Sequence, residues 1–318
     1  MAASVCYFVQ SHRNPEQNYR LIRALRRGSP AGRIVVRHDF ASSPLDWGPL
    51  ATLPDTHLLP GRGPQVRYQF SGQLQPYLEA IEWLERQGLR YDWLVKLSAQ
   101  DYPVMPVPAI EAALDDATCD GFIRYWDVLR PNPYWSRRKA KARYWYRYRQ
   151  LPDRVVPVLR ALRVLTRVLP IHFYLACGAQ VGVRSLRPPF RRGFRCYGGW
   201  SWFTLRRPAV RYLTEFLSEH PQVLAHYRTT LAAEESLVQT VLVNSRRFAL
   251  VDDDHRYIDY ARAVHGAPRT LTGADFPVLA SGRYHFARKF DLDVDAAVLD
   301  RIDRELLGSA AGRSRAGS

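Results

Sequence analysis

A basic pair, Arg288-Lys289, stands between two phenylalanines in the run Phe286–Asp291. Arginine offers a planar fork of N–H donors and lysine a compact positive charge, so the pair is suited to a diphosphate. The flanking Phe286 and Phe290 indicate that the pair is held at a packed surface, not left in open solvent. Such a pair could stabilise a departing diphosphate with side-chain charge in place of a metal ion.

A carboxylate that could act beside this pair is Glu235, near the start of a helix predicted over Glu234–Asn244. A carboxylate in a site can serve as a general base, which takes the proton from an attacking hydroxyl. A glutamate in the first turn of a helix also stabilises the helix dipole, and the adjacent Glu234 could fill either role. The residues alone leave both interpretations open.

Three predicted strands end in polar segments, and in open α/β sheets ligands bind beyond the carboxyl ends of the strands. These segments are Ser11–Asn14, His38-Asp39 and Ser98–Asp101. Asp39 could accept a hydrogen bond from a uracil ring nitrogen or a ribose hydroxyl, although aspartate is also common in turns. Asp101 could likewise contact a substrate or close the turn before Pro103.

The acidic residues do not predict a metal site. Mg²⁺ and Mn²⁺ take several oxygen ligands, and Ser98–Asp101 supplies one carboxylate. Asp-x-Asp patterns recur at Asp252–Asp254, Asp291–Asp293 and Asp293–Asp295. Asp293 and Asp295 suit the first turn of the final helix, where the helix dipole favours negative charge. No two histidines stand at the spacing of zinc ligands.

A glycine pair, Gly198-Gly199, precedes two tryptophans, Trp200 and Trp202. Glycine has no side chain, so the backbone here could approach a ligand closely. The tryptophans could stack on the face of a sugar, or they could belong to the core. Gly199, Trp200 and Trp202 are therefore candidate substrate contacts.

The elements that must position these residues alternate between strand and helix. Asn14-Pro15 is a typical helix start, with a capping side chain and a proline at the first helical position. A strand, a helix and a strand at this spacing indicate a parallel βαβ unit, so we expect an α/β fold with a mostly parallel sheet flanked by helices. The predicted strands are 5–10, 33–37, 93–97, 121–126 and 248–252, and the predicted helices are 16–26, 74–87, 106–114, 208–218, 234–244 and 294–307.

A basic, aromatic segment over 131–170, predicted to be a helical insert, interrupts this alternation. Arg160, Arg163 and Arg167 recur at helical spacing among apolar residues, which suits a helix over 154–169 lying on an anionic membrane. Aromatic residues interleaved with arginine earlier in the insert suit a groove for a glycan or a nucleic-acid strand. A helical pair that packs on the core with its arginines outward is the third interpretation.

The bulk composition favours acidic partners. The chain has 318 residues, a formal net charge of +16 and a pI near 10.0. Its four cysteines are far apart and suggest buried thiols, not a disulfide scaffold. The apolar stretch Val168–Val183 is interrupted by polar residues and falls short of the ~18–20 residues of a membrane-spanning helix. We expect a cytoplasmic protein whose one membrane contact would be peripheral, on the inner membrane face.

Five segments resemble, in order, the motifs of the Core-2/I-branching glycosyltransferase family. They are Ser11–Gln17, Leu97–Pro103, Tyr197–Phe203, Glu234–Leu242 and Phe286–Asp291. This family joins β-1,6-N-acetylglucosaminyltransferases to peptide O-xylosyltransferases. The resemblance implies a nucleotide-sugar transferase fold of the GT-A type. The sequence has no internal repeat or convincing linker, so we expect one domain over 1–307. The composition of 308–318, rich in Gly, Ser and Arg, predicts a disordered tail.

The resemblance also implies a reaction. It is the inverting, metal-independent transfer of N-acetylglucosamine or xylose from a UDP-sugar to a hydroxyl of a glycan or protein acceptor, with no further cofactor. Glu235 would activate the acceptor and Asp39 would contact the nucleoside. The remaining donor-site candidates are His12, Arg13, Arg269, Arg288 and Lys289, and the acceptor-side candidates are Asp101, Gly199, Trp200 and Trp202.

The alternative function is a protein that binds polyanions or nucleic acid without catalysis, which the charge of +16 would suit. The two functions predict different arrangements. A binding module would spread its arginines over one continuous face. A transferase would bring Arg288, Lys289 and Glu235 together at one cleft. On the transferase interpretation we expect no specific nucleic-acid partner.

Overall fold

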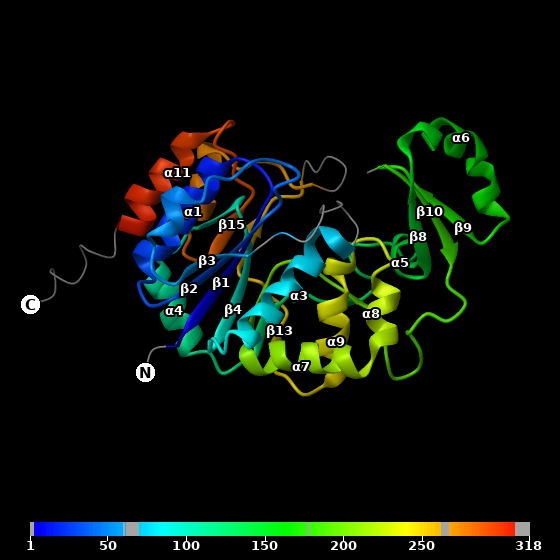
Figure 1. Ribbon diagram of the computed structural model, residues 1–318, viewed down its shortest axis with the longest axis horizontal. Helices are drawn as coiled ribbons and strands as arrows, with labels where there is room; N and C mark the ends of the chain where they lie inside the picture. Colours follow the sequence, from blue (N-terminus) through cyan, green and yellow to red (C-terminus); the bar gives the residue numbers. More distant parts are fainter. Residues whose placement is uncertain (1–2, 60, 62–69, 177, 262–266, 309–318) are drawn as a thin grey trace, which may run out of the picture.

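The computed structural model describes residues 3–59, 61, 70–176, 178–261 and 267–308. Its centre is a seven-stranded sheet in which β12 alone runs antiparallel to its neighbours, so the predicted mostly parallel sheet is confirmed (Figure 1). From edge to edge the strands are β13 (Leu250–Val251), β6 (Gly121–Ile123), β12 (Phe203–Arg206), β4 (Trp93–Ser98), β1 (Val5–Ser11), β2 (Arg33–His38) and β3 (Thr56–Leu59).

Helices cover both faces of this sheet, as predicted (Figure 1). The alternation of side chains along β1 decides which core each residue joins: Cys6 and Phe8 face one core, and Tyr7 faces the other. One face is covered by α3 (Phe70–Arg86), α7 (Arg207–Glu219), α8 (Pro221–Tyr227) and α9 (Leu237–Ser245). The other is covered by α1 (Pro15–Gly28), α4 (Val107–Asp115), α10 (Phe276–Leu279) and α11 (Ala296–Ile302).

Helix α1 begins beside the edge of the sheet where the strands have their carboxyl ends. We name this the ligand edge, because ligands bind there in open α/β sheets. Asn14 caps the helix, since its side-chain oxygen accepts a hydrogen bond of 3.3 Å from the Gln17 N–H, and Pro15 occupies the first turn. Leu21, Ile22 and Leu25 then bury one stripe of the helix. The Asn14 cap and Pro15 predict the start of this helix from the sequence, and the helix begins there.

A second, three-stranded sheet joins distant parts of the chain. It consists of β14 (Arg256–Ile258), β15 (Phe286–Arg288) and β5 (Asp101–Pro103). β15 pairs antiparallel with β5, which places Arg288 opposite Asp101. The basic run Phe286–Asp291 is therefore held against the segment that follows β4.

The insert differs from the prediction. Instead of a helical segment ending at 170, the chain forms a lobe around an antiparallel sheet whose last strand ends at Arg184. The strands are β8 (Tyr146–Leu151), β10 (Ala179–Arg184) and β9 (Ile171–Tyr174), and the helices beside them are α5 (Arg137–Tyr144) and α6 (Val156–Ala161), with a 3₁₀ turn at Leu162–Arg167. In Figure 1 the lobe stands apart from the main sheet, at the end of the molecule opposite α11.

The remaining elements are short: α2 (Gly48–Ala51), β7 (Trp126–Asp127) and β11 (Tyr197–Gly198). Cys6, Cys119 and Cys196 are buried free thiols, whereas Cys177 lies outside the described residues. The predicted tail 308–318 likewise lies outside them, apart from Gly308. In the part of the chain that the structure describes, no helix has the length and apolar character needed to cross a membrane.

Candidate active site

Three of the sequence segments meet at the ligand edge of the main sheet. The Gln17 amide on α1 donates to the Ala99 carbonyl (2.8 Å) and to the Phe290 carbonyl (2.9 Å). The Phe290 N–H in turn donates 2.9 Å to the Gln100 carbonyl. One buried glutamine thus connects the first strand-to-helix turn, the segment after β4 and the basic run that contains Arg288.

The other two segments are joined to each other. The Gly199 N–H donates 2.8 Å to the Glu235 carbonyl, and the Gln239 amide on α9 donates 2.8 Å to the Trp200 carbonyl. An added Cβ at Gly199 would lie 2.0 Å from the Arg124 carbonyl oxygen. Glycine is therefore required here because the chain packs against itself, whereas the sequence suggested an approach to a ligand.

Trp202 connects the three segments joined by Gln17 with the two joined by Gly199, because it lies in Tyr197–Phe203 and contacts Arg288. The Arg288 guanidinium lies 4.0 Å from the centre of its ring, and the Lys96 ammonium lies 5.7 Å away. The ring is only 5% exposed, so Trp202 is a core residue that holds the basic run in place, not an open sugar platform. Trp200 is half-buried and stacks on Tyr260, with 4.9 Å between ring centres.

Asp101 orients the arginines beside it. One carboxylate oxygen accepts from the Ser98 N–H (2.7 Å) and hydroxyl (2.5 Å), which is the turn role left open by the sequence. The other lies 3.5 Å from the Arg288 Nε and 3.9 Å from the Arg256 Nε. Because Asp101 is fully buried, it positions Arg288 from behind and does not face a substrate.

Glu235 lies in a 3₁₀ turn, Ala233–Glu235, just before α9. Its carboxylate forms an ion pair with Arg143 on α5, whose guanidinium lies 4.6 Å from the centre of the Trp135 ring. The pair raises the pKa of Arg143 further above its ordinary value, against the opposing effect of burial. The Glu235 side chain keeps 21% of its surface exposed, so a small hydroxyl could still reach it.

A second pair of ionisable groups is buried beneath the site. Burial, followed by the nearby charge of Glu235, raises the pKa of Glu234 to about 7. Burial lowers the pKa of Lys96 to about 8, although Glu234 opposes the change. The Lys96 ammonium lies between the rings of Tyr77, Trp202 and Phe203, at 5.6, 5.7 and 5.3 Å from their centres.

Sequence reasoning did not select Arg143, Lys96 or Glu234 as site residues. Arg143 is one of 42 arginines, so nothing in its neighbourhood marks it as the partner of Glu235. Lys96 did give a usable signal, because a lysine inside an apolar strand of a lysine-poor chain must have a reason to be buried. Glu234 was seen only as an alternative to Glu235.

The remaining donor-site candidates are already engaged. Asp39 accepts from the Ala41 N–H (3.2 Å) and the Ser42 hydroxyl (2.7 Å), as a turn aspartate does. Arg13 pairs with Asp291 at 2.9 Å. His12 is joined through its carbonyl to the Ser43 hydroxyl at 3.1 Å.

Arg269 is held between two carboxylates. It lies 2.6 Å from Asp259 and also contacts Asp275, and its pKa is raised by these bonds. The next residue but one, Leu271, donates 2.9 Å to the Lys289 carbonyl, which places this segment against the basic run.

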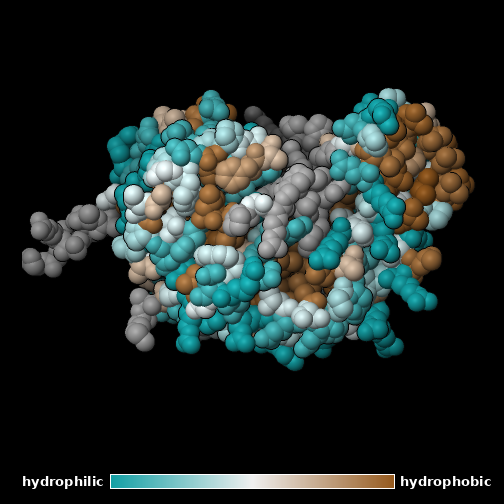
Figure 2. Space-filling view, in the orientation of Figure 1, coloured by the Kyte–Doolittle hydropathy of each residue, from teal (hydrophilic) through white to brown (hydrophobic). Residues whose placement is uncertain are grey.

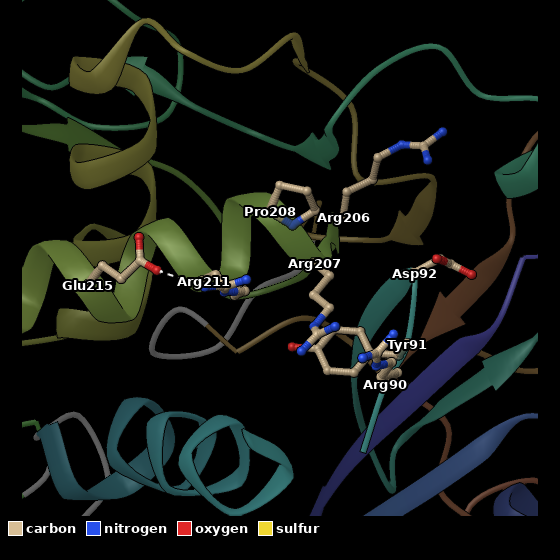
Figure 3. Close-up of a pocket in the computed structure, with 8 residues that line it drawn as sticks. All are labelled: Arg90, Tyr91, Asp92, Arg206, Arg207, Pro208, Arg211 and Glu215. Atoms are coloured by element: carbon tan, nitrogen blue, oxygen red, sulfur yellow. Dashed lines mark hydrogen bonds and ion pairs between the residues drawn. The ribbon is translucent and has the colours of Figure 1, made fainter. Parts of the chain in front are cut away.

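A separate surface hollow lies away from these residues. Its volume is about 630 Å³, and its lining residues, among them Arg206, Arg207 and Arg211, lie near the amino end of β4 (Figure 3). Arg207 and Arg211 pair with glutamates at 3.4 and 3.3 Å, which balances part of their charge. Within the described residues, no three His, Cys, Asp or Glu side chains gather as metal ligands, here or at the ligand edge.

Comparisons with known proteins agree on the kind of protein. A family model described as Core-2/I-branching enzyme matches residues 64–278. The chain is 27% identical over 295 residues to beta-glucuronosyltransferase GlcAT14B of Arabidopsis thaliana, covering 89% of this chain and 62% of that protein. It is 26% identical over 256 residues to xylosyltransferase 2 of Rattus norvegicus, covering 74% of this chain and 26% of that protein.

The chain is thus much shorter than either relative. Among solved structures, one of a glucose-1-phosphate thymidylyltransferase of Bacillus anthracis superposes with a TM-score of 0.36 at 5% identity, covering 78% of this chain and 85% of that one. A similarity of this size carries no argument about the site.

Proposed function

The chain belongs to the Core-2/I-branching enzyme family, and from this premise we propose that it is a glycosyltransferase that uses a UDP-sugar. The observation that carries the proposal is that one short segment, Gly199–Trp202, contacts both Arg288 and the backbone of Glu235. Arg288 stacks on the ring of Trp202. The backbone carbonyl of Glu235 accepts a hydrogen bond from Gly199, which lies three residues before Trp202 in the chain. A base and a diphosphate-binding pair that are held by the same short segment suit the binding of one sugar near it.

The proposed reaction is an inverting displacement. An acceptor hydroxyl oxygen forms a bond to the anomeric carbon while the bond from that carbon to the UDP oxygen breaks on the opposite face. Glu235 takes the hydroxyl proton as general base. The charge on the departing diphosphate is stabilised by Arg288 and Lys289, which supply what a metal ion would otherwise provide.

Neighbouring groups prepare these residues for their roles. Arg143 fixes the carboxylate of Glu235, so that the base does not have to be ordered when the acceptor arrives. Asp101 and Trp202 fix the guanidinium of Arg288 in the same way. We retain Asp39, His12 and Arg13 as residues near the nucleoside, and Arg269 as one beside the basic run.

The donor sugar is a finer question. N-acetylglucosamine and xylose are the donors that the sequence motifs suggest, and the names of the relatives add glucuronic acid and again xylose. We propose xylose or glucuronic acid ahead of N-acetylglucosamine. A glycan or protein hydroxyl is the proposed acceptor.

A UDP-release assay with UDP-xylose, UDP-glucuronic acid and UDP-N-acetylglucosamine, each with and without oligosaccharide and peptide acceptors, tests the proposal. We expect one donor to be consumed faster with an acceptor than without. If UDP and all three donors fail to bind in calorimetry, the proposal is wrong and binding of polyanions becomes the better interpretation. The link of Arg288 and Glu235 through the segment Gly199–Trp202 is what favours transfer over that alternative.

A further inference from the structure

The lobe carries a group of apolar side chains that the described residues leave exposed. Figure 2 shows apolar side chains concentrated over the part of the lobe that contains α6. Val164 is 60% exposed and Val168 80%, which is unusual for large aliphatic side chains this close together. The lobe patch, as we name it, consists of Val158, Leu162, Val164, Val168, Leu169 and Val183.

Positive charge surrounds this patch. Residues 146–187 contain eight arginines and one aspartate, with no lysine or glutamate, which gives a net charge of +7. Arg154, Arg160 and Arg163 are exposed, and none of the ion pairs among the described residues involves them. The one acid, Asp153, is occupied in accepting a hydrogen bond of 3.1 Å from the Ala179 N–H.

Each possible occupant of the patch makes a different demand. A nucleic acid would neutralise the arginines but would leave the aliphatic side chains in water. A second copy of the chain, docked patch to patch, would bring two surfaces of +7 together, and like charges in contact oppose such a dimer. An anionic bilayer satisfies both features, because acyl chains take up the aliphatic groups while lipid headgroups face the arginines.

We propose that the lobe patch docks on an anionic membrane surface. α6 and the following turn lie in the interface, with Val164 and Val168 among the acyl chains and Arg160 and Arg163 at the headgroups. Docking needs no donor sugar, so the docking proposal can be tested independently of the proposed transfer reaction. A failure in one can be told from a failure in the other by measuring UDP binding in the same samples.

The test is co-sedimentation with vesicles of phosphatidylcholine that contain 40% phosphatidylglycerol, a composition chosen for the assay, against vesicles of phosphatidylcholine alone. We expect the protein to pellet with the anionic vesicles at low salt and to be released near 1 M salt, where the Debye length falls to about 3 Å. Pure phosphatidylcholine vesicles should leave it in the supernatant.

The double variant Val164→Asp with Val168→Asp should reduce the partition coefficient roughly tenfold or more, because charges replace the inserting side chains. Val294→Asp is the matched control, since Val294 is also 60% exposed but lies beside α11, at the other end of the molecule. It should pellet like the wild type. Arg160→Gln with Arg163→Gln should lose roughly 25-fold, at about fivefold for each arginine near an anionic surface.

Three results would overturn docking: no pelleting with anionic vesicles at low salt, equal pelleting of the Val164/Val168 variant, or equal loss in the Val294 control. A concentration-dependent dimer that the Val164/Val168 variant abolishes would show a second copy on the patch, and would also overturn it. Circular dichroism of each variant verifies that it folds. We expect folding to be preserved, because the substituted side chains are strongly exposed.

Discussion

Arginines near the ligand edge of the main sheet are packed against carboxylates and rings, whereas those of the lobe extend into solvent. Arg288 has Asp101 on one side and Trp202 on the other, with only 12% of its side chain exposed. Arg160 and Arg163 are exposed and lack such partners within the described residues. On the proposed roles, the high net charge has two uses in one chain: fixed cations that recognise one ligand geometry, and open cations that attract a charged surface.

The largest effect we expect comes from the base. Glu235→Gln should lower turnover by roughly 10²–10⁴-fold while UDP affinity stays unchanged, because the amide cannot accept the hydroxyl proton. Initial rates and UDP calorimetry measure the two quantities. Glu215→Gln, on the exposed face of α7, is the matched control. Wild-type turnover in the Glu235 variant would remove Glu235 from this role.

The buried pair beneath the site should give the protein a pH-dependent stability. The pKa of Glu234 is raised to about 7, so the folded state keeps a proton that the unfolded state has already lost near pH 4.5. The stabilisation is complete below pH 4.5 and is lost as the pH rises through 7, a change of about 3 kcal/mol in the free energy of unfolding.

Urea unfolding at pH 5, 6, 7 and 8 tests this. Glu234→Gln should flatten the profile, leaving the smaller fall due to Asp254, whose pKa burial raises to about 6. A profile as steep as that of the wild type would show that another group is responsible. Lys96 acts in a different range, because its lowered pKa makes stability rise with pH above about 8.

Arg288→Ala should weaken UDP binding by roughly 10- to 100-fold, the value of a hydrogen bond to a charged group. Uridine binding should hardly change, because uridine lacks the diphosphate. Arg160→Ala in the lobe is the matched control and should bind both ligands like the wild type. Equal losses of UDP and uridine affinity in the Arg288 variant would mean that the residue supports the fold instead.

The smallest expected effect is that of metal removal. With Arg288 and Lys289 supplying the positive charge, EDTA should leave the rate of UDP release within about twofold of its untreated value. Added Mn²⁺ should not raise it. Restoration by Mn²⁺ of a rate lost to EDTA would contradict metal-independent transfer.

The sequence predicted the main sheet better than the lobe for a physical reason. β1, α1 and β2 are defined by local signals, the apolar run and the Asn14-Pro15 cap, and their pairing follows from the crossover rule. The strands of the lobe are amphipathic at best, and their pairing connects Tyr146 with Arg184 across an intervening helix. No local pattern encodes such a contact, so a basic apolar stretch suggested only a helix.

The site divides in the same way. Arg288, Lys289 and Glu235 could be chosen from residue type and family motif. The burial of Glu234 and Lys96, and the pairing of Arg143 with Glu235, depend on tertiary packing. Two adjacent glutamates differ only once the fold has buried Glu234 fully and left Glu235 partly exposed, so the distinction is absent from the sequence pattern.

The pairing of β15 with β5 has a consequence for the synthesis of the protein. Translation proceeds from the amino end, so β5 and its Asp101 leave the ribosome long before Arg288 is made. Tyr102 is likewise made long before Asp303, the residue to which its hydroxyl donates a hydrogen bond of 2.7 Å. The nascent chain can therefore form most of its central sheet before Arg288 and Lys289, the residues proposed to bind the nucleotide diphosphate, have been made. On the proposed role of these residues, the donor site is completed after the sheet, and we expect a chain terminated before Arg288 to be unable to bind the donor.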